Sequence, residues 1–570
     1  MQLKFDLSRT LSARPLVAIA ALIAALSSPL GGQNRRFFDD DPIARVVDTQ
    51  DASGARRKSV NLFYDEGRNL FGKPGDPDRT KRAQNVNTID EVPDSTWFNN
   101  RIGSRPMTVE EVAKGPDTAT GPAPGAWTVT SGKSDGVTPG FTIRDTAGDL
   151  WFIKFDPPKY PEMASGAEAA VTKLYHALGY NVPENHVTKL TREGLVINEK
   201  SRITSVDGAE RRLTPRDIDR LLRMGAQESD GSYRVIASKA VAGKPIGPFL
   251  YVGTRSDDPN DVVPHENRRE LRALRVFGAW TNHVDSKAIN SLDTLVTDSG
   301  RAVVRHYLID FGSTMGSASI KAREYDEGFE YIVDGKATVK NMAGLGFYIP
   351  SYHFVDYPDY PSAGNFSADQ FDPPKWKPRV PNPAFIRARA DDTFWGARRV
   401  MAFTDEMIRA AVRTGKYTDA AAEKHIADTL IARRDAIGRA WLTNVNPVIS
   451  PALDGSGTLT FANPAVDHGV AKPPSAYEVS WHAFDNATGA TKPIGAATTS
   501  STPKVAAPQG LPTAAGSFIR ADISATGADP EWAKPVHAYF KRTGSGWQLV
   551  GFDRTPDLDQ KRPNQTSGGR

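Results

Sequence analysis

The 570-residue chain contains no cysteine. This absence excludes disulfides, thiolate metal sites, cysteine nucleophiles and a lipidated N-terminal cysteine. The chain also lacks an excess of one charge, because 71 Lys and Arg residues stand against 67 Asp and Glu residues and leave a net charge of +4. So small an excess on so long a chain does not indicate a nucleic-acid-binding protein.

What is present is an ordinary globular composition. Hydrophobic residues make up 39% of the chain and charged residues 24%, which allows a sizeable core and excludes wholesale disorder. The length predicts two or three domains. With 48 glycines and 41 prolines, the sequence predicts many turns and long connections rather than a helical rod.

The N-terminus has the three regions of a secretory signal peptide. Residues 1–14 are basic, Leu16–Leu26 is an unbroken apolar run, and residues 27–33 are mostly small and turn-forming. The apolar run is shorter than the roughly 20 residues that span a membrane, although an uncleaved N-terminal anchor remains the alternative. We therefore predict export, to the bacterial periplasm or the outside of the cell.

Composition divides the remaining chain into four parts. Residues 34–125 are polar and rich in turns, which predicts an extended segment that wraps a later domain. Residues 126–444 alternate between strand and helix patterns, with a change near residue 240. Residues 450–555 are short alternating segments separated by Gly, Pro, Ser and Thr, as in a small β-sandwich, and residues 556–570 form a polar tail predicted to be disordered.

Local patterns in the second part predict individual elements. The expected strands are Trp127–Thr130, Gly140–Arg144, Asp149–Phe155 and Tyr233–Ala240. The expected helices are Pro161–Leu178 and Glu266–Thr281. Two apolar runs, at 292–296 and 303–309, flank Asp298-Ser299-Gly300 and predict a hairpin. Residues 346–381 have no period and predict a long aromatic loop, whereas residues 384–444 are helical, with Thr404 and Thr418 as expected N-caps.

One segment carries a specific chemical pattern. Residues 283–290 read His-Val-Asp-Ser-Lys-Ala-Ile-Asn, and the hairpin that follows ends at Asp310-Phe311-Gly312. An H-x-D-x-K-x-x-N match is expected roughly once in a thousand chains of this length. Followed by Asp-Phe-Gly one hairpin later, the segment resembles the catalytic loop and the magnesium loop of the protein-kinase-like superfamily.

The resemblance implies a role for each residue of the pattern. Phosphoryl transfer needs a carboxylate beside the attacking hydroxyl, a cation near the transferred phosphate and oxygen ligands for Mg²⁺. Asp285 would then be the base or orienting group, and Lys287 would neutralise the γ-phosphate. Asn290 and Asp310 would hold the metal, and His283 would be an architectural residue.

Upstream residues extend the resemblance. Lys154 ends an apolar strand as the phosphate-binding lysine of kinases does, and Glu168 follows on the next helix as its expected ion-pair partner. A glycine-containing loop at 132–140 lies where a phosphate-covering loop belongs, with Lys133 and Gly136 as candidate nucleotide contacts. Its glycines are four apart, unlike G-x-G-x-x-G, so the chain looks similar to divergent branches such as the HipA-type and secretory-pathway kinases.

Taken together, these patterns predict an α+β fold: a bilobal kinase-like core, an irregular N-terminal segment and a C-terminal all-β, sandwich-like domain. The small lobe would span about 126–240 and the large lobe about 241–444. The implied activity is transfer of the γ-phosphate of ATP, with Mg²⁺, to a hydroxyl of a protein, sugar or small molecule. Adenylyl transfer on the same fold and an inactive binding protein of the cell envelope, with a protein or glycan partner on the β-domain, are the alternatives.

Overall fold

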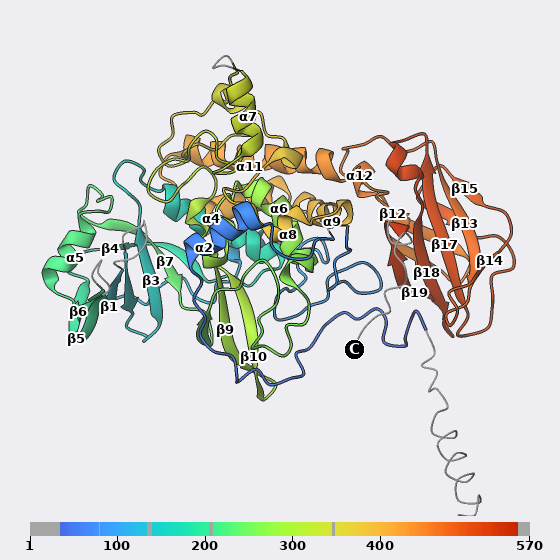
Figure 1. Cartoon of the computed structure of the whole chain (residues 1–570), viewed down its shortest axis with the longest axis horizontal. Helices are drawn as coiled ribbons and strands as arrows, with labels where there is room; N and C mark the ends of the chain where they lie inside the picture. The colour runs from blue at the N-terminus through green and yellow to red at the C-terminus, as the bar shows by residue number, and fades with distance from the viewer. Residues whose placement is uncertain (1–34, 79, 134–139, 205–208, 345–347, 557–570) are drawn as a thin grey trace, which may run out of the picture.

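The computed structural model describes residues 35–78, 80–133, 140–204, 209–344 and 348–556. The predicted signal peptide, Gly136 and nearly all of the predicted tail lie outside these ranges. The described part is a mixed fold of helices and several sheets, with strand-rich regions on both sides of a helical middle (Figure 1). Among the described residues, no helix combines the length and the apolar character that a membrane crossing needs.

A seven-stranded sheet lies within residues 127–239, in the order β4-β7-β3-β2-β1-β5-β6. Its strands are β1 (Trp127–Lys133), β2 (Gly140–Arg144), β3 (Leu150–Phe155), β4 (Asn185–Leu190), β5 (Leu195–Thr204), β6 (Glu210–Arg212) and β7 (Tyr233–Lys239). On the central strand β3, Trp151 and Ile153 enter a buried apolar cluster, whereas Phe152 on the other face is 47% exposed. The alternation is the mark of a strand with one buried face, and it confirms the strand predicted at 149–155.

Helix α4 (Met163–Leu178) packs against this sheet and confirms the helix predicted at 161–178. Every residue of α4 except His176 is buried. Ala169 packs with Val187 of β4 and Ile236 of β7. The small residues of α4 allow close packing elsewhere on the helix as well, since a Cβ added at Gly166 would lie 2.4 Å from the Tyr417 ring.

The middle of the molecule is built on helix α6 (Arg269–Thr281) and the hairpin that follows it. Strands β9 (Ser291–Asp298) and β10 (Arg301–Leu308) pair antiparallel, as predicted, and β8 (Lys244–Gly247) adds to β9. Ser299 and Gly300 both have positive φ, 50° and 81°, which is the backbone of a type I′ turn. The hairpin thereby brings the chain back to the loop that follows α6.

Five further helices complete the helical region: α7 (Gly335–Ala343), α8 (Pro383–Ile386), α9 (Ala390–Met401), α10 (Asp405–Arg413) and α11 (Ala420–Trp441). Thr404 caps α10 by accepting a hydrogen bond from the Met407 amide at 3.2 Å, as predicted. Thr418 is not the cap of α11, which is a correction: the Asp419 side chain accepts from the Ala421 amide at 2.8 Å, and the Thr418 amide donates to Glu162 at 2.9 Å.

The N-terminal segment, residues 35–125, runs along several parts of the molecule. It contains α2 (Leu62–Gly67), a π-helical turn at Arg68–Gly72 and α3 (Val109–Lys114). Phe37 packs against aromatic rings of the C-terminal region, the Lys58 amide donates to the Ile246 carbonyl, and Asp117 forms an ion pair with Lys173 of α4. In Figure 1 the segment is the blue trace that passes below and in front of the helices.

A cluster of buried charges, here called the Arg269 cluster, surrounds the first residue of α6. Arg269 donates to Asp90, Asp391 and Asp392 at 2.8–3.0 Å, and Arg272 donates to Asp392 at 3.1 Å. Both arginines are 0% exposed. Asp90 comes from the N-terminal segment and the other two carboxylates from the first turn of α9, so the cluster ties three distant stretches of chain together.

The C-terminal region is composed of two sheets with one short helix and one 3-10 turn. The first sheet has the order β11-β12-β16, and the second has the order β14-β13-β17-β18-β19, with β15 paired to β13. The strands are β11 (Ile449–Leu453), β12 (Thr458–Ala462), β13 (Ala476–Phe484), β14 (Thr491–Pro493), β15 (Thr498–Ser500), β16 (Lys504–Ala506), β17 (Phe518–Thr526), β18 (Val536–Arg542) and β19 (Trp547–Asp553), and the helix is α12 (Pro464–Asp467). Their apolar faces belong to the same buried cluster as helices α4, α6 and α9, so the core runs through both regions.

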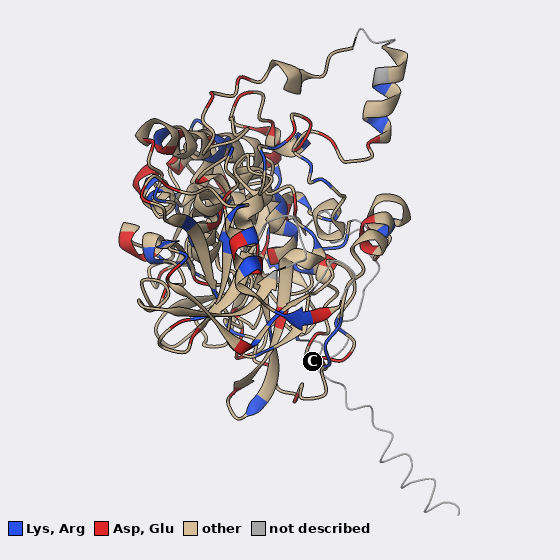
Figure 2. Ribbon diagram, turned by 90° about the vertical axis from the view of Figure 1, so that its left-hand side faces the viewer, with Lys and Arg blue, Asp and Glu red and all other residues tan. Residues whose placement is uncertain are grey.

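Charge is distributed without a dominant sign. Figure 2 shows Lys and Arg interspersed with Asp and Glu over the helices and loops of the view, in keeping with the small net charge.

Candidate active site

The loop at 283–290 is held by the end of α6. Asn282 ends the helix in the left-handed conformation, with φ 50° and ψ 42°, which turns the chain sharply. The His283 amide still donates to the Gly278 carbonyl at 2.8 Å, and the Ser286 hydroxyl donates to the His283 carbonyl at 2.8 Å. The loop then closes with a 3-10 turn, Ala288–Asn290, and enters β9, so its polar side chains are fixed by backbone geometry on both sides.

Asp285, Lys287 and Asn290 form one hydrogen-bonded group within this loop. The Asn290 amide nitrogen donates to the Asp285 carboxylate at 2.9 Å and to the Asp285 carbonyl at 2.8 Å. The Lys287 ammonium lies 2.9 Å from the other carboxylate oxygen of Asp285. Asp285 is thus oriented by two partners, while its side chain stays 27% exposed and accessible to an incoming group.

The Asp-Phe-Gly segment lies beside the loop because the hairpin returns there. Ser291 pairs with Leu308 across the β9–β10 ladder, and the Ile309 amide donates to the Asn290 carbonyl at 3.0 Å. Asp310 follows at once, in the left-handed region with φ 64°. Such a conformation costs a non-glycine residue energy and is typical of functional positions.

Lys154, on strand β3 of the seven-stranded sheet, contacts the Asp310-Phe311-Gly312 segment. Its ammonium donates to both carboxylate oxygens of Glu168, at 3.0 and 2.9 Å, and to Asp310 at 2.7 Å. Burial by itself would lower the pKa of Lys154, but the Asp310 and Glu168 carboxylates outweigh it and raise that pKa. A Cβ added at Gly312 would lie 3.2 Å from Glu168, so the glycine of the segment leaves room for this ion pair.

His283 is a buried packing residue between these parts. Its ring centroid lies 5.9 Å from that of Phe311 and 6.2 Å from that of Tyr175 on α4. Burial lowers the pKa of His283 to about 4, so the ring is neutral near pH 7. This placement agrees with an architectural rather than a proton-carrying role.

Glu66 is a residue of the site that sequence reasoning missed. Its carboxylate lies 3.1 Å from the Lys287 ammonium, and it is carried by the short helix α2 of the N-terminal segment. The Lys287 ammonium therefore lies between two carboxylates, which raise its pKa although burial works in the opposite direction. No local signal marks Glu66, because 221 residues separate it from its partner.

The donor set fits a hard divalent cation. Two lysines, Lys154 and Lys287, face four carboxylates: Glu66, Glu168, Asp285 and Asp310. Carboxylate and amide oxygens are the ligands that Mg²⁺ prefers. The Asn290 amide nitrogen is turned toward Asp285, which leaves its amide oxygen for another partner. The Asp310 side chain is 44% exposed, so the negative excess opens toward solvent.

The predicted phosphate-loop residues are only partly covered by the structure. Lys133 is the last residue of β1, and Gly136 lies outside the described residues, so their contact with phosphate stays a prediction. Gly140, at the far end of the loop, pairs with Lys154 across β2 and β3. A Cβ there would lie 2.1 Å from the Ile153 carbonyl oxygen, so only glycine fits beside the strand that carries Lys154.

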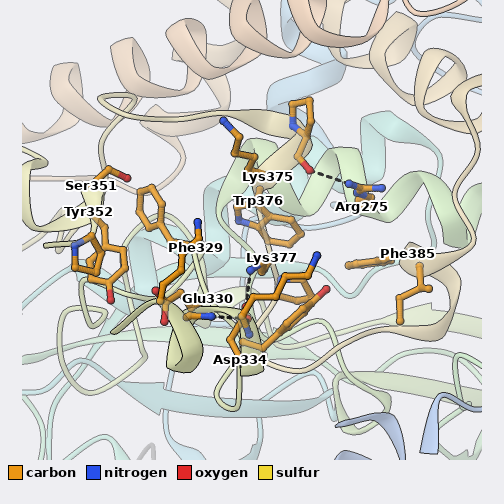
Figure 3. Close-up of a pocket in the computed structure, with 18 of the residues that line it drawn as sticks. Arg275, Phe329, Glu330, Asp334, Ser351, Tyr352, Lys375, Trp376, Lys377 and Phe385 are labelled. Carbon is orange, nitrogen blue, oxygen red and sulfur yellow. Dashed lines mark hydrogen bonds and ion pairs between the residues drawn. The ribbon is translucent and has the colours of Figure 1, made fainter. Parts of the chain in front are cut away.

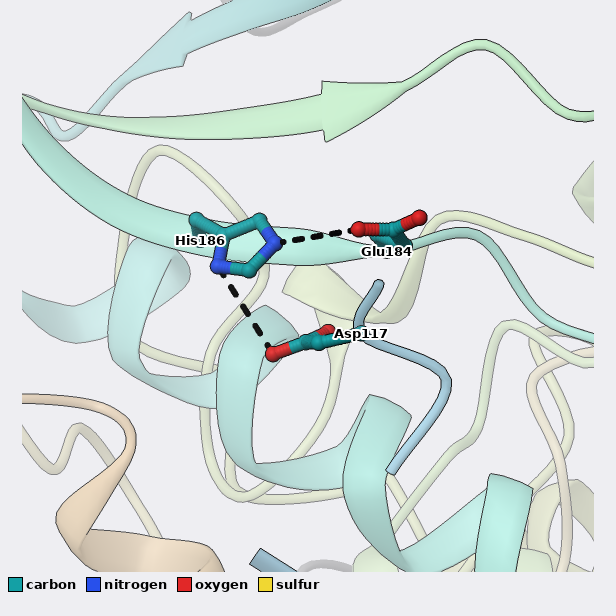
Figure 4. Close-up of side chains that lie close together, drawn as sticks. All are labelled: Asp117, Glu184 and His186. Carbon is teal, nitrogen blue, oxygen red and sulfur yellow. Dashed lines mark hydrogen bonds and ion pairs between the residues drawn. The ribbon is translucent and has the colours of Figure 1, made fainter. Parts of the chain in front are cut away.

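A second group of potential metal ligands is formed by other residues. Asp117, Glu184 and His186 bring their ligand atoms within 4.8 Å of one another (Figure 4). The buried ammonium of Lys173 bonds to the Asp117 carboxylate, and the Thr118 hydroxyl donates to Glu184 at 2.5 Å. With a lysine already neutralising Asp117, we interpret the group as an ion cluster that fastens the N-terminal segment to α4.

Comparison with known proteins places the chain only loosely. No protein-family model and no curated protein sequence matches it. The Helicobacter pylori proinflammatory kinase CtkA is similar to it with a TM-score of 0.26 and 11% identity, over 53% of this chain and 94% of CtkA. A Golgi casein kinase has a TM-score of 0.26 and 10% identity, over 70% of this chain and 96% of that kinase. Both neighbours are kinases, but a TM-score this low carries no argument about this chain.

Proposed function

We propose that the protein is a kinase-like phosphotransferase that moves the γ-phosphate of ATP, with Mg²⁺, to a hydroxyl acceptor. The observation that carries this proposal is the position of Lys154, which bonds to Glu168 and to Asp310 at once. Three residues that are far apart in the sequence, and that the resemblance pairs, meet at one ammonium group. Chance would not be expected to bring them together beside the 283–290 loop.

The chain's own residues divide the work as follows. Bound nucleotide and Mg²⁺ supply the phosphoryl group and neutralise its charge. Lys154 and Lys287 hold phosphate oxygens, and Asp310 with the amide oxygen of Asn290 holds the metal. Asp285 orients the acceptor hydroxyl and takes its proton as the hydroxyl oxygen bonds to the γ-phosphorus, while the bond from that phosphorus to the β,γ-bridging oxygen breaks and ADP leaves. Asn290 keeps Asp285 in place through two hydrogen bonds.

Two wider parts of the proposal rest on sequence alone. The basic, apolar and small regions of residues 1–33 support export, which would place the enzyme outside the cytoplasm, where ATP is expected to be scarce. The C-terminal sheets, which we propose to be a sandwich-like domain, offer a surface for an envelope protein or glycan.

Nucleotide binding is the first test. Purified protein is expected to bind ATP in the presence of Mg²⁺, and Asp310→Ala is expected to abolish this binding because it removes a metal ligand and a partner of Lys154. Asp298→Asn, on the turn of the same hairpin, is the matched control and should bind normally. Absence of binding to both ATP and GTP would contradict the two enzymatic interpretations.

Label transfer then separates the reactions. Incorporation of label from the γ-phosphate supports a kinase, and incorporation from the α-phosphate supports adenylyl transfer. Asp285→Ala is expected to fold and to bind nucleotide while transfer falls by about 10²–10⁴-fold, because the hydroxyl loses its base. Binding without any transfer by the native protein would favour an inactive kinase-like binding protein.

A further inference from the structure

A cavity of about 550 Å³ opens between α7, α6 and residues 374–386 (Figure 3). Its size lies in the range of pockets that hold small ligands or a few side chains. Its basic lining residues are Arg275, Lys336, Lys340, Lys375 and Lys377. Only two acidic residues, Glu330 and Asp334, line it. We call it the basic cavity.

Arg275 is the best-fixed cation of the basic cavity. It is the only residue of α6 that is not buried, and it reaches the cavity from that otherwise enclosed helix. Its guanidinium donates to the Pro374 carbonyl at 2.9 Å, as Figure 3 shows. Within the part of the chain that the structure describes, it forms no ion pair with a carboxylate, and burial lowers its pKa. A half-buried cation without a counter-charge favours an anionic ligand.

The two acidic residues of the cavity do not cancel its charge. Asp334 forms an ion pair with Lys377 at 2.5 Å, and Glu330 bonds to the Tyr352 hydroxyl. Lys336 and Lys340 lie exposed on α7 and form no ion pair with any described residue. Lys375 is also paired, with Asp372 at 2.6 Å. Three cations of the cavity, Arg275, Lys336 and Lys340, therefore form no ion pair with a carboxylate of the described chain.

The apolar lining indicates which kind of anion fits. Trp376 and Phe385 lie with ring centroids 6.4 Å apart at the cavity. The two rings are themselves only 5% and 4% exposed, whereas α7 and the residues before it expose aliphatic side chains, with Ile332 51%, Val339 65% and Met342 72% exposed. Sugars stack on aromatic rings but gain little from aliphatic side chains, whereas polypeptides bury both kinds of residue. An acidic polypeptide segment therefore fits better than an acidic glycan.

The wall of the basic cavity is continuous with the loop that carries Asp285. The Trp376 indole donates to the Asn282 side chain at 3.0 Å. The Arg379 amide donates to the Val284 carbonyl at 2.8 Å, and the Asn382 side chain donates to the Ser286 carbonyl at 3.1 Å. The two residues that flank Asp285 are thus bonded to the stretch that follows Trp376, which links one wall of the cavity to the loop that carries Asp285.

We propose that the basic cavity binds acidic side chains of a protein acceptor and so delivers a neighbouring hydroxyl of that acceptor to Asp285. This assignment rests on the proposed function, because it names the substrate class of the same site. Asp and Glu side chains of the acceptor would pair with Arg275 and Lys336, and its apolar side chains would cover the exposed aliphatic residues of α7.

Peptide binding in the absence of nucleotide tests the assignment. One labelled synthetic peptide carries a serine among glutamates and leucines, and a second carries glutamines in place of the glutamates. The full-length protein is expected to bind the first peptide at least about tenfold more tightly by fluorescence anisotropy, because charge-assisted hydrogen bonds are lost in the second. Equal affinity for both peptides would overturn the proposal.

Variants locate the binding. Arg275→Gln and Lys336→Gln are each expected to weaken binding of the acidic peptide severalfold. Lys336 lies on an exposed helix, so its substitution is not expected to impair folding. Lys492→Gln, on exposed strand β14, removes the same charge elsewhere and should leave affinity unchanged. Unchanged affinity in both cavity variants would contradict the assignment, as would tighter, Arg275-dependent binding of a glucuronate oligosaccharide.

The outcome is separable from that of the proposed function. If Asp285→Ala and the native protein both lack transfer activity while Arg275-dependent peptide binding persists, the phosphotransferase proposal fails and the binding site stands. If transfer occurs without preference between the two peptides, the phosphotransferase stands and the substrate assignment fails.

Discussion

Helix α6 has a cluster of charges at each end, and the two clusters differ in kind. At its start, the Arg269 cluster joins fully buried arginines and carboxylates. Beyond its end, the candidate active site joins Lys154 and Lys287 to four carboxylates, of which Asp310 is 44% exposed. Thirteen residues of one rigid helix separate a closed arrangement from an open one.

The difference shows how charge balance distinguishes an ion cluster that stabilises the fold from one that can bind a ligand. In the Arg269 cluster, the Asp90 carboxylate is buried, yet Arg269 and Arg82 keep its pKa well below the usual range. Every charge there has a protein partner, so the cluster can only fasten the chain. In the candidate active site the four carboxylates outnumber the two lysines, and although Glu168 is buried, the Asp310 side chain is 44% exposed, an arrangement that suits a cationic ligand.

Removing Arg269 should have the largest effect on stability. Arg269→Met leaves Asp90, Asp391 and Asp392 buried without their main partner and is expected to lower the free energy of unfolding by about 3–5 kcal/mol, measured by denaturant titration. The control Lys424→Met, in an exposed i,i+4 pair with Asp428, should cost less than about 1 kcal/mol. Equal effects would show that burial of the Arg269 cluster does not matter.

A fall in pH should lower the stability of the fold through protonation of His283. Its pKa is about 4 in the fold against 6.5 when unfolded, so the unfolded chain binds the proton first as the pH falls. Its stabilising contribution is therefore complete above pH 6.5 and is lost toward pH 4, by about 3 kcal/mol. Other histidines titrate in the same range, so the test compares the pH dependence of unfolding in the native protein and in His283→Gln. Parallel curves would contradict it.

Substitution of Glu168 tests the same comparison, because it should weaken nucleotide binding without lowering the stability of the fold. Glu168→Gln removes one charge from a group with an excess of carboxylates and leaves Lys154 paired with Asp310. Stability should change by less than about 1 kcal/mol, since the pair is not left unpartnered. Affinity for ATP with Mg²⁺ should fall by about tenfold, as Lys154 loses a partner that positions it. A loss of stability as large as that of Arg269→Met would break the comparison.

The smallest expected effect belongs to Glu66. Its pair with Lys287 is partly exposed, with side chains 24% and 21% accessible, and is worth at most about 1 kcal/mol. Glu66→Gln frees Lys287 for phosphate, so affinity for ATP should rise about two- to threefold in calorimetric titration. A decrease in affinity would mean that Glu66 positions Lys287 for the nucleotide rather than competing with it.

Sequence predicted what lies within single elements. The strand that carries Lys154, the helix that carries Glu168 and the hairpin before Asp310 each have a complete local signal: alternation, helical composition or a turn motif. The resemblance to kinases predicted the pair of Lys154 with Glu168, and the structure adds Asp310, which was predicted only as a metal ligand, to the same ammonium group.

What sequence could not predict depends on distant partners. Glu66 and the members of the Arg269 cluster are ordinary polar residues until the fold brings them to partners 120 to 221 residues away. Helix α7 was also missed, because it is short and exposed, and its two large apolar residues, Val339 and Met342, are too few to give it a period. At α11, two adjacent residues could both cap the helix by their side-chain oxygens, and it is Asp419 that accepts from the Ala421 amide.

The contacts of the Arg269 cluster also give the chain a mechanical property. Arg36 pairs with Asp553, and Arg554 lies 3.6 Å from Asp90, so the first and last described stretches are fastened to each other. A force that pulls the two ends apart loads these ion pairs and the rings around Phe37 before it reaches α6. Neither ion pair includes a residue of the candidate active site, so a pull on the two ends would load contacts outside that site first.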